Sequence, residues 1–239
     1  MPDTLSRTLS RAERLRAALA GQAVDRVPVA LWRHFPGDDQ HPDDLAAATL
    51  AFQRDYDFDF VKVTPASSYS VRDWGAQDEW RGSPEGNRAY THYPIQTPAD
   101  WERLPELDPR AGSLGEHLAC LRQVGRGLGA DTPFLATIFN PLAQAKNLAG
   151  NPRLLDHLRA APEALHAGLE TITRTTVRFL QAAQEAGISG IFLAVQHANR
   201  RLLSPAEYRE FGEPYDRRIL AAAGDLWLNI LHLHGEARV

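Results

Sequence analysis

The chain has 239 residues, of which 44% are hydrophobic and 23% are charged, and it carries a formal net charge of -4 with a pI near 6.1. This composition is typical of a soluble globular protein, and the lack of a basic run argues against a nucleic-acid partner. No apolar run approaches the ~18 residues that a membrane-spanning helix needs, and the N-terminus has no apolar signal-peptide core.

Cysteine and lysine are both scarce. Cys120 is the only cysteine, which excludes an internal disulfide and a thiolate-rich metal site. The sequence therefore favours a reducing, cytoplasmic location. The only lysines are Lys62 and Lys146, so arginine carries nearly all of the positive charge.

Helices and strands alternate along the chain, beginning with an amphipathic helix over residues 5–20. Residues 70–96 are rich in Gly, Trp, Tyr and Asn and predict an excursion with a hairpin. Short apolar runs that end in polar residues predict five strands, over 29–32, 58–64, 133–139, 188–195 and 226–235. Further helices are expected over 41–54, 113–127, 142–149, 152–159 and 162–186, and from Ser204 to Gly224 with a break at Pro214.

The strands are near-continuous apolar runs separated by helices, a pattern that predicts a parallel sheet covered by helices. No glycine-rich phosphate loop follows the first strand, which argues against a nucleotide-binding doubly wound fold. We therefore predict an α/β fold of the (β/α)8 TIM-barrel type, as a single domain over residues 1–239.

A closed barrel of this type needs eight strands and typically ~250 residues. Only five strand candidates occur in this sequence. The expectation is therefore an incomplete barrel with about five of the eight β/α units, lacking its C-terminal part.

Active sites of such barrels lie at the carboxyl ends of the strands. His232 and His234 occupy alternate positions of the last strand, so both point to the same face. Two imidazoles placed in this way suit a shared metal ion or an anionic substrate. The polar residues that follow the other strand candidates are Arg33, His34, Thr64, Asn140, Gln196 and His197.

Several other polar or aromatic residues fit structural roles better. The carboxylates of Asp55, Asp57 and Asp59 precede or lie within a strand, at the wrong end for catalysis in a barrel. We expect packing or structural roles for Asp73-Trp74-Gly75, Trp80, Tyr90, Trp101 and Cys120.

Several segments resemble the uroporphyrinogen decarboxylase superfamily. They are Glu13-Arg14-Leu15 with Asp25-Arg26-Val27-Pro28, then Phe58 to Pro65, Asp73-Trp74-Gly75, Leu203 to Tyr208, and Leu231 to Gly235. The order and spacing of these segments carry the resemblance, which covers nearly the whole chain but only the first two-thirds of a typical member. The resemblance implies a (β/α)8 barrel.

One branch of the superfamily transfers methyl groups between a corrinoid protein and a thiol or related acceptor. It uses zinc held by a His-x-Cys pair and a later cysteine. The resemblance implies that His232 matches the histidine and that His234 replaces the first cysteine. Zinc accepts imidazole and activates a bound thiol or water.

The decarboxylases of the superfamily use no cofactor and hold substrate carboxylates with arginines after the first strand. Arg33 stands where the first arginine is expected. The sequence departs from that pattern at three places. Phe35-Pro36-Gly37-Asp38 replaces the stretch with the second arginine. Thr64-Pro65 stands roughly where the aspartate that binds the pyrrole nitrogens is expected, and Asn147 falls near the position of the family's tyrosine.

Three functional hypotheses follow. The first is zinc-dependent methyl transfer with a corrinoid protein, with His232 and His234 as ligands and His232 and His197 as catalytic residues. The second is cofactor-free decarboxylation of uroporphyrinogen in porphyrin biosynthesis. The third is an inactive barrel fragment that associates through its open edge. A second copy of the chain, in a homodimer, is a further expected partner. In the enzyme readings the substrate contacts are Arg33, His34, Asn140 and Gln196.

Overall fold

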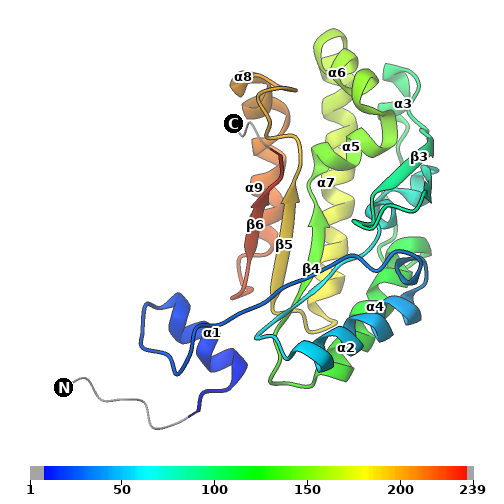
Figure 1. The fold of residues 1–239 in the computed structure, drawn as a ribbon. Helices are drawn as coiled ribbons and strands as arrows, with labels where there is room; N and C mark the ends of the chain where they lie inside the picture. The colour runs from blue at the N-terminus through cyan, green and yellow to red at the C-terminus, as the bar shows by residue number, and fades with distance from the viewer. Residues whose placement is uncertain (1–7, 236–239) are drawn as a thin grey trace.

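The computed structural model describes residues 8–235, and its core is a four-stranded parallel sheet of order β1-β4-β5-β6. A separate antiparallel hairpin, β2–β3, projects from the connection between β1 and β4 (Figure 1). The strands are β1 (Val61–Val63), β2 (Gln77–Trp80), β3 (Arg88–His92), β4 (Phe134–Phe139), β5 (Gly190–Val195) and β6 (Ile230–Leu233).

Two helices precede β1, and further helices connect β1 to β4, β4 to β5 and β5 to β6, as expected for parallel pairs. They are α1 (Arg11–Leu19), α2 (Pro42–Tyr56), α3 (Pro98–Glu102), α4 (Gly112–Leu128), α5 (Pro141–Ala149), α6 (Asn151–Ala160), α7 (Pro162–Gln184), α8 (Pro205–Phe211) and α9 (Glu213–Ala222). Within residues 8–235, none of these helices combines the length and apolar character needed to cross a membrane.

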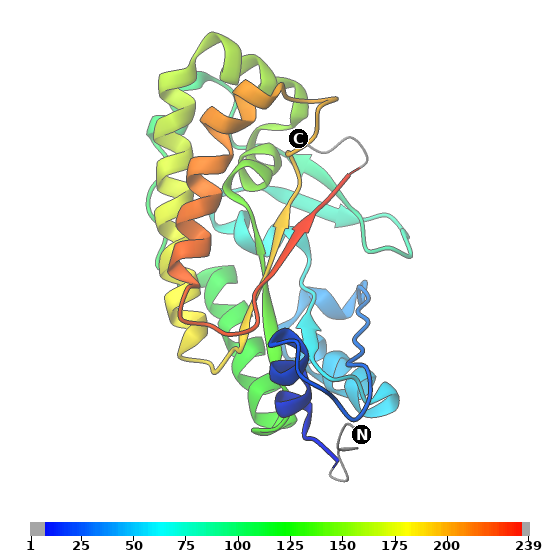
Figure 2. The ribbon, with the colours of Figure 1, turned by 90° about the vertical axis from the view of Figure 1, so that its left-hand side faces the viewer.

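Helices cover one face of the sheet, and the other face carries the hairpin. The long helices α7 and α9 pack against each other on the covered face (Figure 2). Ile191 and Leu193 of β5 are fully buried between the sheet and these helices. The carboxyl ends of the strands point towards α5, α6 and α8, whereas α1 lies at the amino end (Figure 1).

The alternation of side chains places a different set of residues on the uncovered face. The register pairs Thr137 with Phe192 and Ala194 with His232 across neighbouring strands. Together with Lys62 of β1, these side chains lie on the same face of the sheet because every second residue of a strand points the same way.

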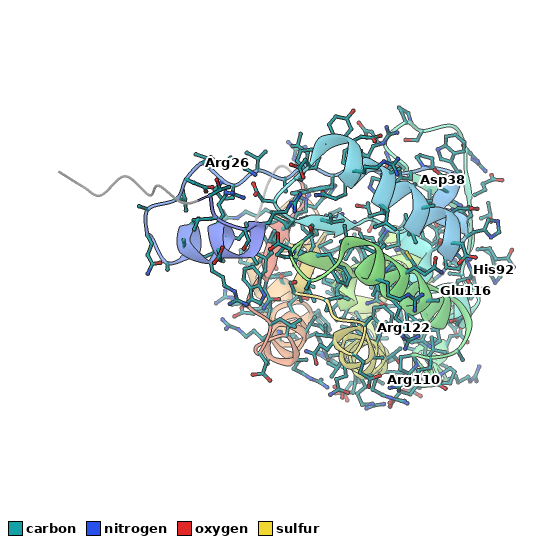
Figure 3. All side chains as sticks on the ribbon, turned by 90° about the horizontal axis from the view of Figure 1, so that it is seen from below. Arg26, Asp38, His92, Arg110, Glu116 and Arg122 are labelled. Atoms are coloured by element: carbon teal, nitrogen blue, oxygen red, sulfur yellow. The ribbon has the colours of Figure 1, made fainter. Side chains whose placement is uncertain are left out.

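A network of ion pairs closes the amino end of the sheet. Asp59 precedes β1, is fully buried, and accepts hydrogen bonds from Arg14 at 2.7 Å, from Arg26 at 2.7 and 2.9 Å, and from the backbone N–H of Val29 at 2.7 Å. Arg14 also pairs with Asp25 at 2.7 Å. Seen from below, Arg26 lies on the α1 side of the molecule (Figure 3). These contacts tie α1 and the segment after it to the sheet.

Three expectations about the elements need correction. The predicted strand 29–32 is extended, but within the described residues it does not join the sheet, and its backbone contact with the segment before β1 is one bond from Asp59 N–H to Val29 C=O. One hydrogen bond does not make a ladder, so the described sheet has four parallel strands rather than five. The helix after Ser204 breaks at Gly212, not at Pro214, because proline is tolerated in the first turn of α9.

The predicted helix 5–20 begins at Arg11 in the structure, and Ser10 caps it in a capping box with Glu13. Residues 5–7 of that prediction lie outside the described residues. The predicted hairpin is confirmed as β2–β3, and the expected helices over 113–127, 142–149, 152–159 and 162–186 correspond to α4, α5, α6 and α7.

Candidate functional site

A cavity of about 1000 Å³ lies over the uncovered face at the carboxyl ends of the strands. Its floor consists of alternate residues of all four parallel strands, and its walls come from the segment after residue 31, the hairpin and α5. The lining includes Trp32, Arg33, His34, Lys62, Thr64, Glu85, Gly86, Arg88, Tyr90, Thr137, Phe139, Lys146, Asn151, Phe192, Gln196, His197, Arg201, His232 and His234.

The loop of the β2–β3 hairpin closes one side of this cavity over His34. Gly86 has a φ of +70°, and a Cβ at this position would lie 2.5 Å from the Cβ of His34. Only glycine fits such a contact in this backbone conformation. At the base of the hairpin, the Tyr90 hydroxyl lies 3.0 Å from the Ser67 hydroxyl, and burial raises the pKa of Tyr90.

Lys62 extends from β1 into the cavity floor, although only 8% of the residue is exposed. Its Nζ donates a hydrogen bond to Thr64 Oγ1 at 3.1 Å and lies 4.6 Å from the ring centre of Phe192 and 5.8 Å from that of Trp32. No carboxylate in residues 8–235 pairs with it. Burial lowers the pKa of Lys62 to about 7, because the ammonium loses hydration without gaining a counter-ion.

Positive charge dominates the cavity wall. Arg33 and Lys146 line it beside Lys62, and none of the three has an ion-pair partner among the described residues, whereas Arg88 is paired with Asp78. Lys146 Nζ lies 5.8 Å from the ring centre of Tyr90, and burial lowers the pKa of Lys146.

His232 and His234 both line the cavity, as the strand periodicity predicts. Their ring centres are 5.8 Å apart, and the His232 ring stacks on Phe192 with ring centres 5.1 Å apart. Two imidazoles on one tetrahedral zinc, at about 2.0–2.1 Å from the metal, have ring centres roughly 5 Å apart, so a small movement would let both bind one ion.

Among residues 8–235, no group of three or more His, Cys, Asp or Glu side chains is arranged to hold a metal ion. Cys120, a potential soft ligand, is buried in α4, where burial raises the pKa of its thiol to about 12. The described residues therefore offer two histidines near each other and not the four ligands of a closed zinc site.

His197 lies at the end of β5 and is nearly fully buried. Its Nε2 lies 2.9 Å from Asn151 Oδ1, an atom that only accepts, so Nε2 carries the proton and Nδ1 is an acceptor without a hydrogen-bond partner. Burial, followed by the charge of Lys146, lowers the pKa of His197 to about 4. Burial also lowers the pKa of His34, so both rings are neutral near pH 7.

Asn140 does not belong to the cavity lining. It is fully buried, its Oδ1 accepts a hydrogen bond from Ala143 N–H at the start of α5, and its amide donates to both oxygens of Asp216 at 3.1 and 3.3 Å. The substrate-contact role expected for Asn140 is therefore replaced by helix capping and a buried link to α9. Gln196, one residue beyond β5, does line the cavity.

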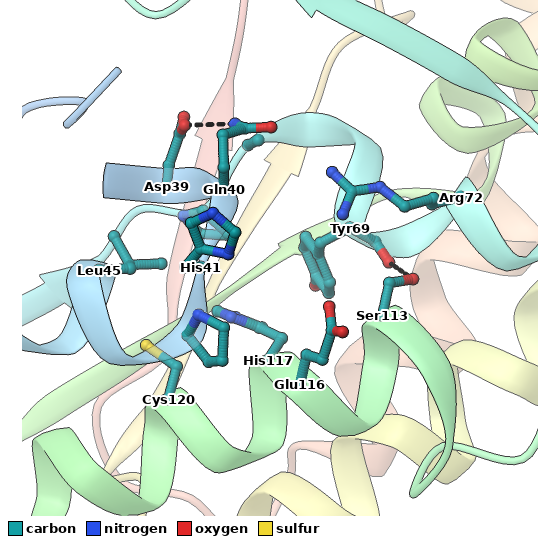
Figure 4. Close-up of a pocket in the computed structure, with 13 residues that line it drawn as sticks. Asp39, Gln40, His41, Leu45, Tyr69, Arg72, Ser113, Glu116, His117 and Cys120 are labelled. Carbon is teal, nitrogen blue, oxygen red and sulfur yellow. Dashed lines mark hydrogen bonds between the residues drawn. The ribbon is translucent and has the colours of Figure 1, made fainter. Parts of the chain in front are cut away.

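Other hollows of the surface fit a functional site less well. A pocket between α2 and α4, lined by His41, Tyr69, His117 and Cys120 (Figure 4), has a volume of about 30 Å³, enough for roughly one water molecule. A larger hollow of about 630 Å³, lined by Arg16, Arg122 and Trp227, lies at the amino end of the sheet. Barrel enzymes do not place their active sites at that end.

Sequence reasoning missed Lys62, Lys146 and Tyr90 as members of the cavity. The two lysines of the chain both line it, although neither follows a strand end in the pattern that singled out the histidines. A lysine in the middle of an apolar strand was the available signal for Lys62. Tyr90 was expected to pack only, and its contact with Ser67 across the cavity wall required the tertiary structure.

Comparison with known proteins places this chain in a family. The uroporphyrinogen decarboxylase (URO-D) profile matches residues 10–238, and the chain belongs to this family. The uroporphyrinogen decarboxylase of Syntrophotalea carbinolica is 32% identical over 145 residues, which cover 58% of this chain and 41% of that protein. The uroporphyrinogen decarboxylase of Corynebacterium diphtheriae is 27% identical over 190 residues, covering 77% of this chain and 53% of that protein.

The chain spans about half the length of these curated relatives. A methyltransferase from Methanosarcina mazei has the same fold, with a TM-score of 0.81 and 21% identity over 95% of this chain and 70% of that chain. The parallel sheet and its helices thus form part of a (β/α)8-type barrel, which stays open in the described residues.

Proposed function

We propose that this chain binds a carboxylated substrate in the cavity and takes part in its decarboxylation. The observation that carries the proposal is the set of three cations, Arg33, Lys62 and Lys146, that line one cavity without a carboxylate partner in residues 8–235. Such groups are stabilised when an anionic ligand supplies the missing negative charge.

The floor of the cavity adds apolar and aromatic surface to this charge. Phe139, Phe192 and Trp32 line it, and Trp32 packs edge-to-face on Phe192 with ring centres 5.2 Å apart. Mostly apolar surface with a few fixed polar groups is typical of sites for small organic ligands. The combination favours an organic acid over an inorganic anion.

Uroporphyrinogen is the first substrate to test, because the curated relatives are named for its decarboxylation. Arg33 occupies the position expected for a carboxylate-binding arginine. Thr64-Pro65 stands where an aspartate for the pyrrole nitrogens is expected, and the side chain of Thr64 instead accepts a hydrogen bond from Lys62. A smaller carboxylic acid is therefore a second substrate class for the same assay.

The experiment measures both binding and turnover. Binding of uroporphyrin and of simple di- and tricarboxylates is measured by calorimetry, and loss of carboxylates from uroporphyrinogen is followed by chromatography. Arg33→Gln and Lys146→Gln should each weaken binding about fivefold to tenfold, or about 1 kcal/mol.

The matched control is Arg217→Gln. Arg217 is 74% exposed in its side chain and pairs with Glu213 on α9, outside the cavity, so its substitution should leave binding unchanged. Equal affinities for the three variants and the parent chain would refute the carboxylate site. Intact binding with no turnover of any acid would support the third hypothesis, a non-catalytic chain.

Zinc-dependent methyl transfer with a corrinoid protein is the second candidate function. The observation that favours it is the placement of His232 and His234 on one face of β6, with both rings at the cavity. These residues would hold the metal, which would activate a bound thiol acceptor. The proposal needs at least one further ligand from outside the described side chains.

Metal content tests this second candidate. We expect the chain to take up zinc from buffered solution only weakly, because the described residues offer two candidate ligands, and to lose this uptake in both His232→Ala and His234→Ala. The His166→Ala variant is the control, because the His166 ring stacks on Phe211 outside the cavity. A folded parent chain that takes up no zinc from buffered solution would remove these two histidines as a metal site.

A further inference from the structure

The Lys62 side chain differs from the other lysine of the chain in its burial and in its place in the sheet. Of the two lysines in the sequence, Lys62 is the more deeply buried, and it alone emerges from a strand of the sheet. Lys62 lies between Val61 and Val63 in β1. Because side chains alternate along a strand, the Lys62 amine points to the cavity, on the face opposite to the two valines. The amine therefore faces a space that a ligand can enter.

The immediate surroundings of the Lys62 Nζ are apolar and aromatic. Phe192 and Trp32 lie on the cavity side of the amine, with ring centres at 4.6 and 5.8 Å, and the one hydrogen-bond partner is Thr64 Oγ1 at 3.1 Å. The aromatic faces attract the ammonium form, but the loss of hydration outweighs this attraction and brings the pKa to about 7. A much larger share of this amine than of an exposed lysine is therefore neutral and nucleophilic at neutral pH.

Thr64 fixes the direction of this amine. Its hydroxyl donates to the backbone C=O of Lys62 at 3.3 Å and so presents a lone pair to the Lys62 Nζ. Thr64 acts through Lys62 and is a positioning residue.

We propose that the Lys62 Nζ forms an imine with the carbonyl carbon of an oxo acid whose carboxylate is held by the cations of the cavity. This inference rests on the proposed function in one respect, namely that the site holds a carboxylate. It adds the substrate class and a catalytic residue that neither the sequence pattern nor the family match assigns.

The chemistry balances with water and protons from solvent as the only co-reactants. The amine nitrogen attacks the carbonyl carbon, and the carbonyl oxygen leaves as water with two protons, one from the amine and one from solvent, to give a protonated imine. In a β-oxo acid, the bond to the carboxylate then breaks, CO₂ leaves, and the electron pair moves to the iminium nitrogen as an enamine. A second proton from solvent adds to carbon, and water hydrolyses the protonated imine to release the ketone, the free amine and one proton, so that one proton is consumed overall.

Reductive trapping tests the proposal on the full chain. The chain is incubated with acetoacetate at pH 7, reduced with borohydride, digested and mapped by mass spectrometry. Mapping distinguishes Lys62 from Lys146 and from the α-amino group. We expect the adduct on Lys62 to exceed that on Lys146 by at least roughly tenfold, and the mass of the adduct reports whether CO₂ left before reduction.

Variants connect the adduct to the geometry. Lys62→Arg keeps the charge but cannot form the imine, and should lose the adduct at this peptide. Thr64→Val should slow reductive trapping of the imine several-fold and should move the pH at which trapping is half-maximal away from about 7. Thr64→Ser, which keeps the hydroxyl, should retain the trapping rate and the half-maximal pH of the parent chain. The pH midpoint distinguishes positioning from a purely structural role, and circular dichroism confirms that each variant is folded.

Label that falls equally on Lys62 and Lys146, or only on other amines, overturns the proposal in the parent chain without recourse to a variant. The affinity of the same chain for a tricarboxylate is measured in parallel, so that failure of the imine can be distinguished from failure of the proposed carboxylate site. Carboxylate binding without an adduct refutes the imine alone, and an adduct without dependence on Arg33 or Lys146 refutes the carboxylate site alone.

Discussion

The two ends of the parallel sheet hold charged side chains in opposite ways. At the amino end, buried Asp59 is matched by Arg14 and Arg26, and Arg14 is matched in turn by Asp25. At the carboxyl end, Lys62 and its two neighbouring cations line a cavity without ion-pair partners in the described residues. A buried charge that is paired serves the fold, and one left unpaired at a cavity is a candidate for binding or chemistry.

This difference appears in the pKa values of the two ends. At the amino end, the hydrogen bond from Arg14 lowers the pKa of Asp25, and hydrogen bonds from Arg26, Val29 and Arg14 outweigh the desolvation of Asp59 and lower its pKa as well. At the carboxyl end, burial alone lowers the pKa of Lys62. The surroundings at the amino end therefore stabilise the charged forms of Asp25 and Asp59, whereas those at the carboxyl end destabilise the charged form of Lys62.

Breaking the amino-end network should have the largest effect. Asp59→Ala leaves Arg14 buried without one of its partners and should lower the free energy of unfolding by about 3 kcal/mol. Urea denaturation measures the change. Asp55→Ala is the control, since Asp55 and Arg54 form an exposed pair at 3.5 Å that should contribute less than about 1 kcal/mol. Equal effects of the two substitutions would contradict the role given to Asp59.

Removing the unpaired cation should act in the other direction. The folded-state pKa of Lys62, about 7, lies below its ordinary value of 10.5, so below pH 7 the native state holds a buried charge that destabilises it. This penalty fades as the pH rises from about 7 towards 10.5. Lys62→Met should therefore stabilise the chain by about 2 kcal/mol at pH 6 and by much less at pH 10.

Thermal or urea unfolding at the two pH values measures this change, and carboxylate binding is measured in parallel. Lys62→Met should weaken binding while it stabilises the fold, a trade-off typical of functional sites. A gain in stability that is the same at pH 6 and pH 10 would exclude the buried charge as its cause.

Disturbing the wall of the cavity should have an intermediate effect. Gly86→Ala forces a left-handed backbone conformation on alanine and places a Cβ against His34, so it should destabilise by about 1–2 kcal/mol and weaken ligand binding several-fold. Gly82→Ala is a matched control, because Gly82 has a φ of +83° and a Cβ there meets nothing within 4 Å. Binding losses of equal size would show that the contact with His34 does not shape the site.

Salt should have the smallest effect and should separate the two ends. The cations line a cavity that solvent ions can enter, so raising the KCl concentration from about 0.05 to about 0.5 M should weaken carboxylate binding roughly threefold. The buried pairs of Asp59 are screened much less, so the melting temperature should change little. Titration of a carboxylate at both salt concentrations, with a melting curve at each, checks both expectations.

The pattern of apolar runs predicted the sheet strands well, with β1, β4, β5 and β6 each inside an expected strand. It failed for residues 29–32, whose apolar run fits a strand but whose backbone bonds to the neighbouring segment only once. Leu31 is 64% exposed there, and Leu231 on the edge strand β6 is 53% exposed. A local run of apolar residues indicates a preference for extended backbone, whereas pairing into a sheet depends on which segments of the folded chain lie beside that run.

The candidate site was predicted in part. Strand periodicity placed His232 and His234 on one face, and the strand-end rule brought Arg33, His34, Gln196 and His197 to the cavity. The same rule also named Asn140, which the structure places outside the cavity lining at the N-cap of α5, because an asparagine before Pro141 caps a helix as readily as it faces a ligand. Whether any of these residues binds metal or substrate stays a prediction.

The alternation of strands and helices, the parallel sheet and the end at which polar residues gather could all be predicted from the amino-acid pattern, because they follow from local periodicity and from the rule that parallel strands align their carboxyl ends. The pairing of charges could not be predicted in this way, because it depends on the folded chain. Asp59 meets Arg14 from 45 residues away, and the two lysines meet one cavity from different elements. Desolvation and ion pairing depend on neighbours that are distant in the chain, so the charge state of Lys62, and with it the chemistry proposed for this site, could be read only from the fold.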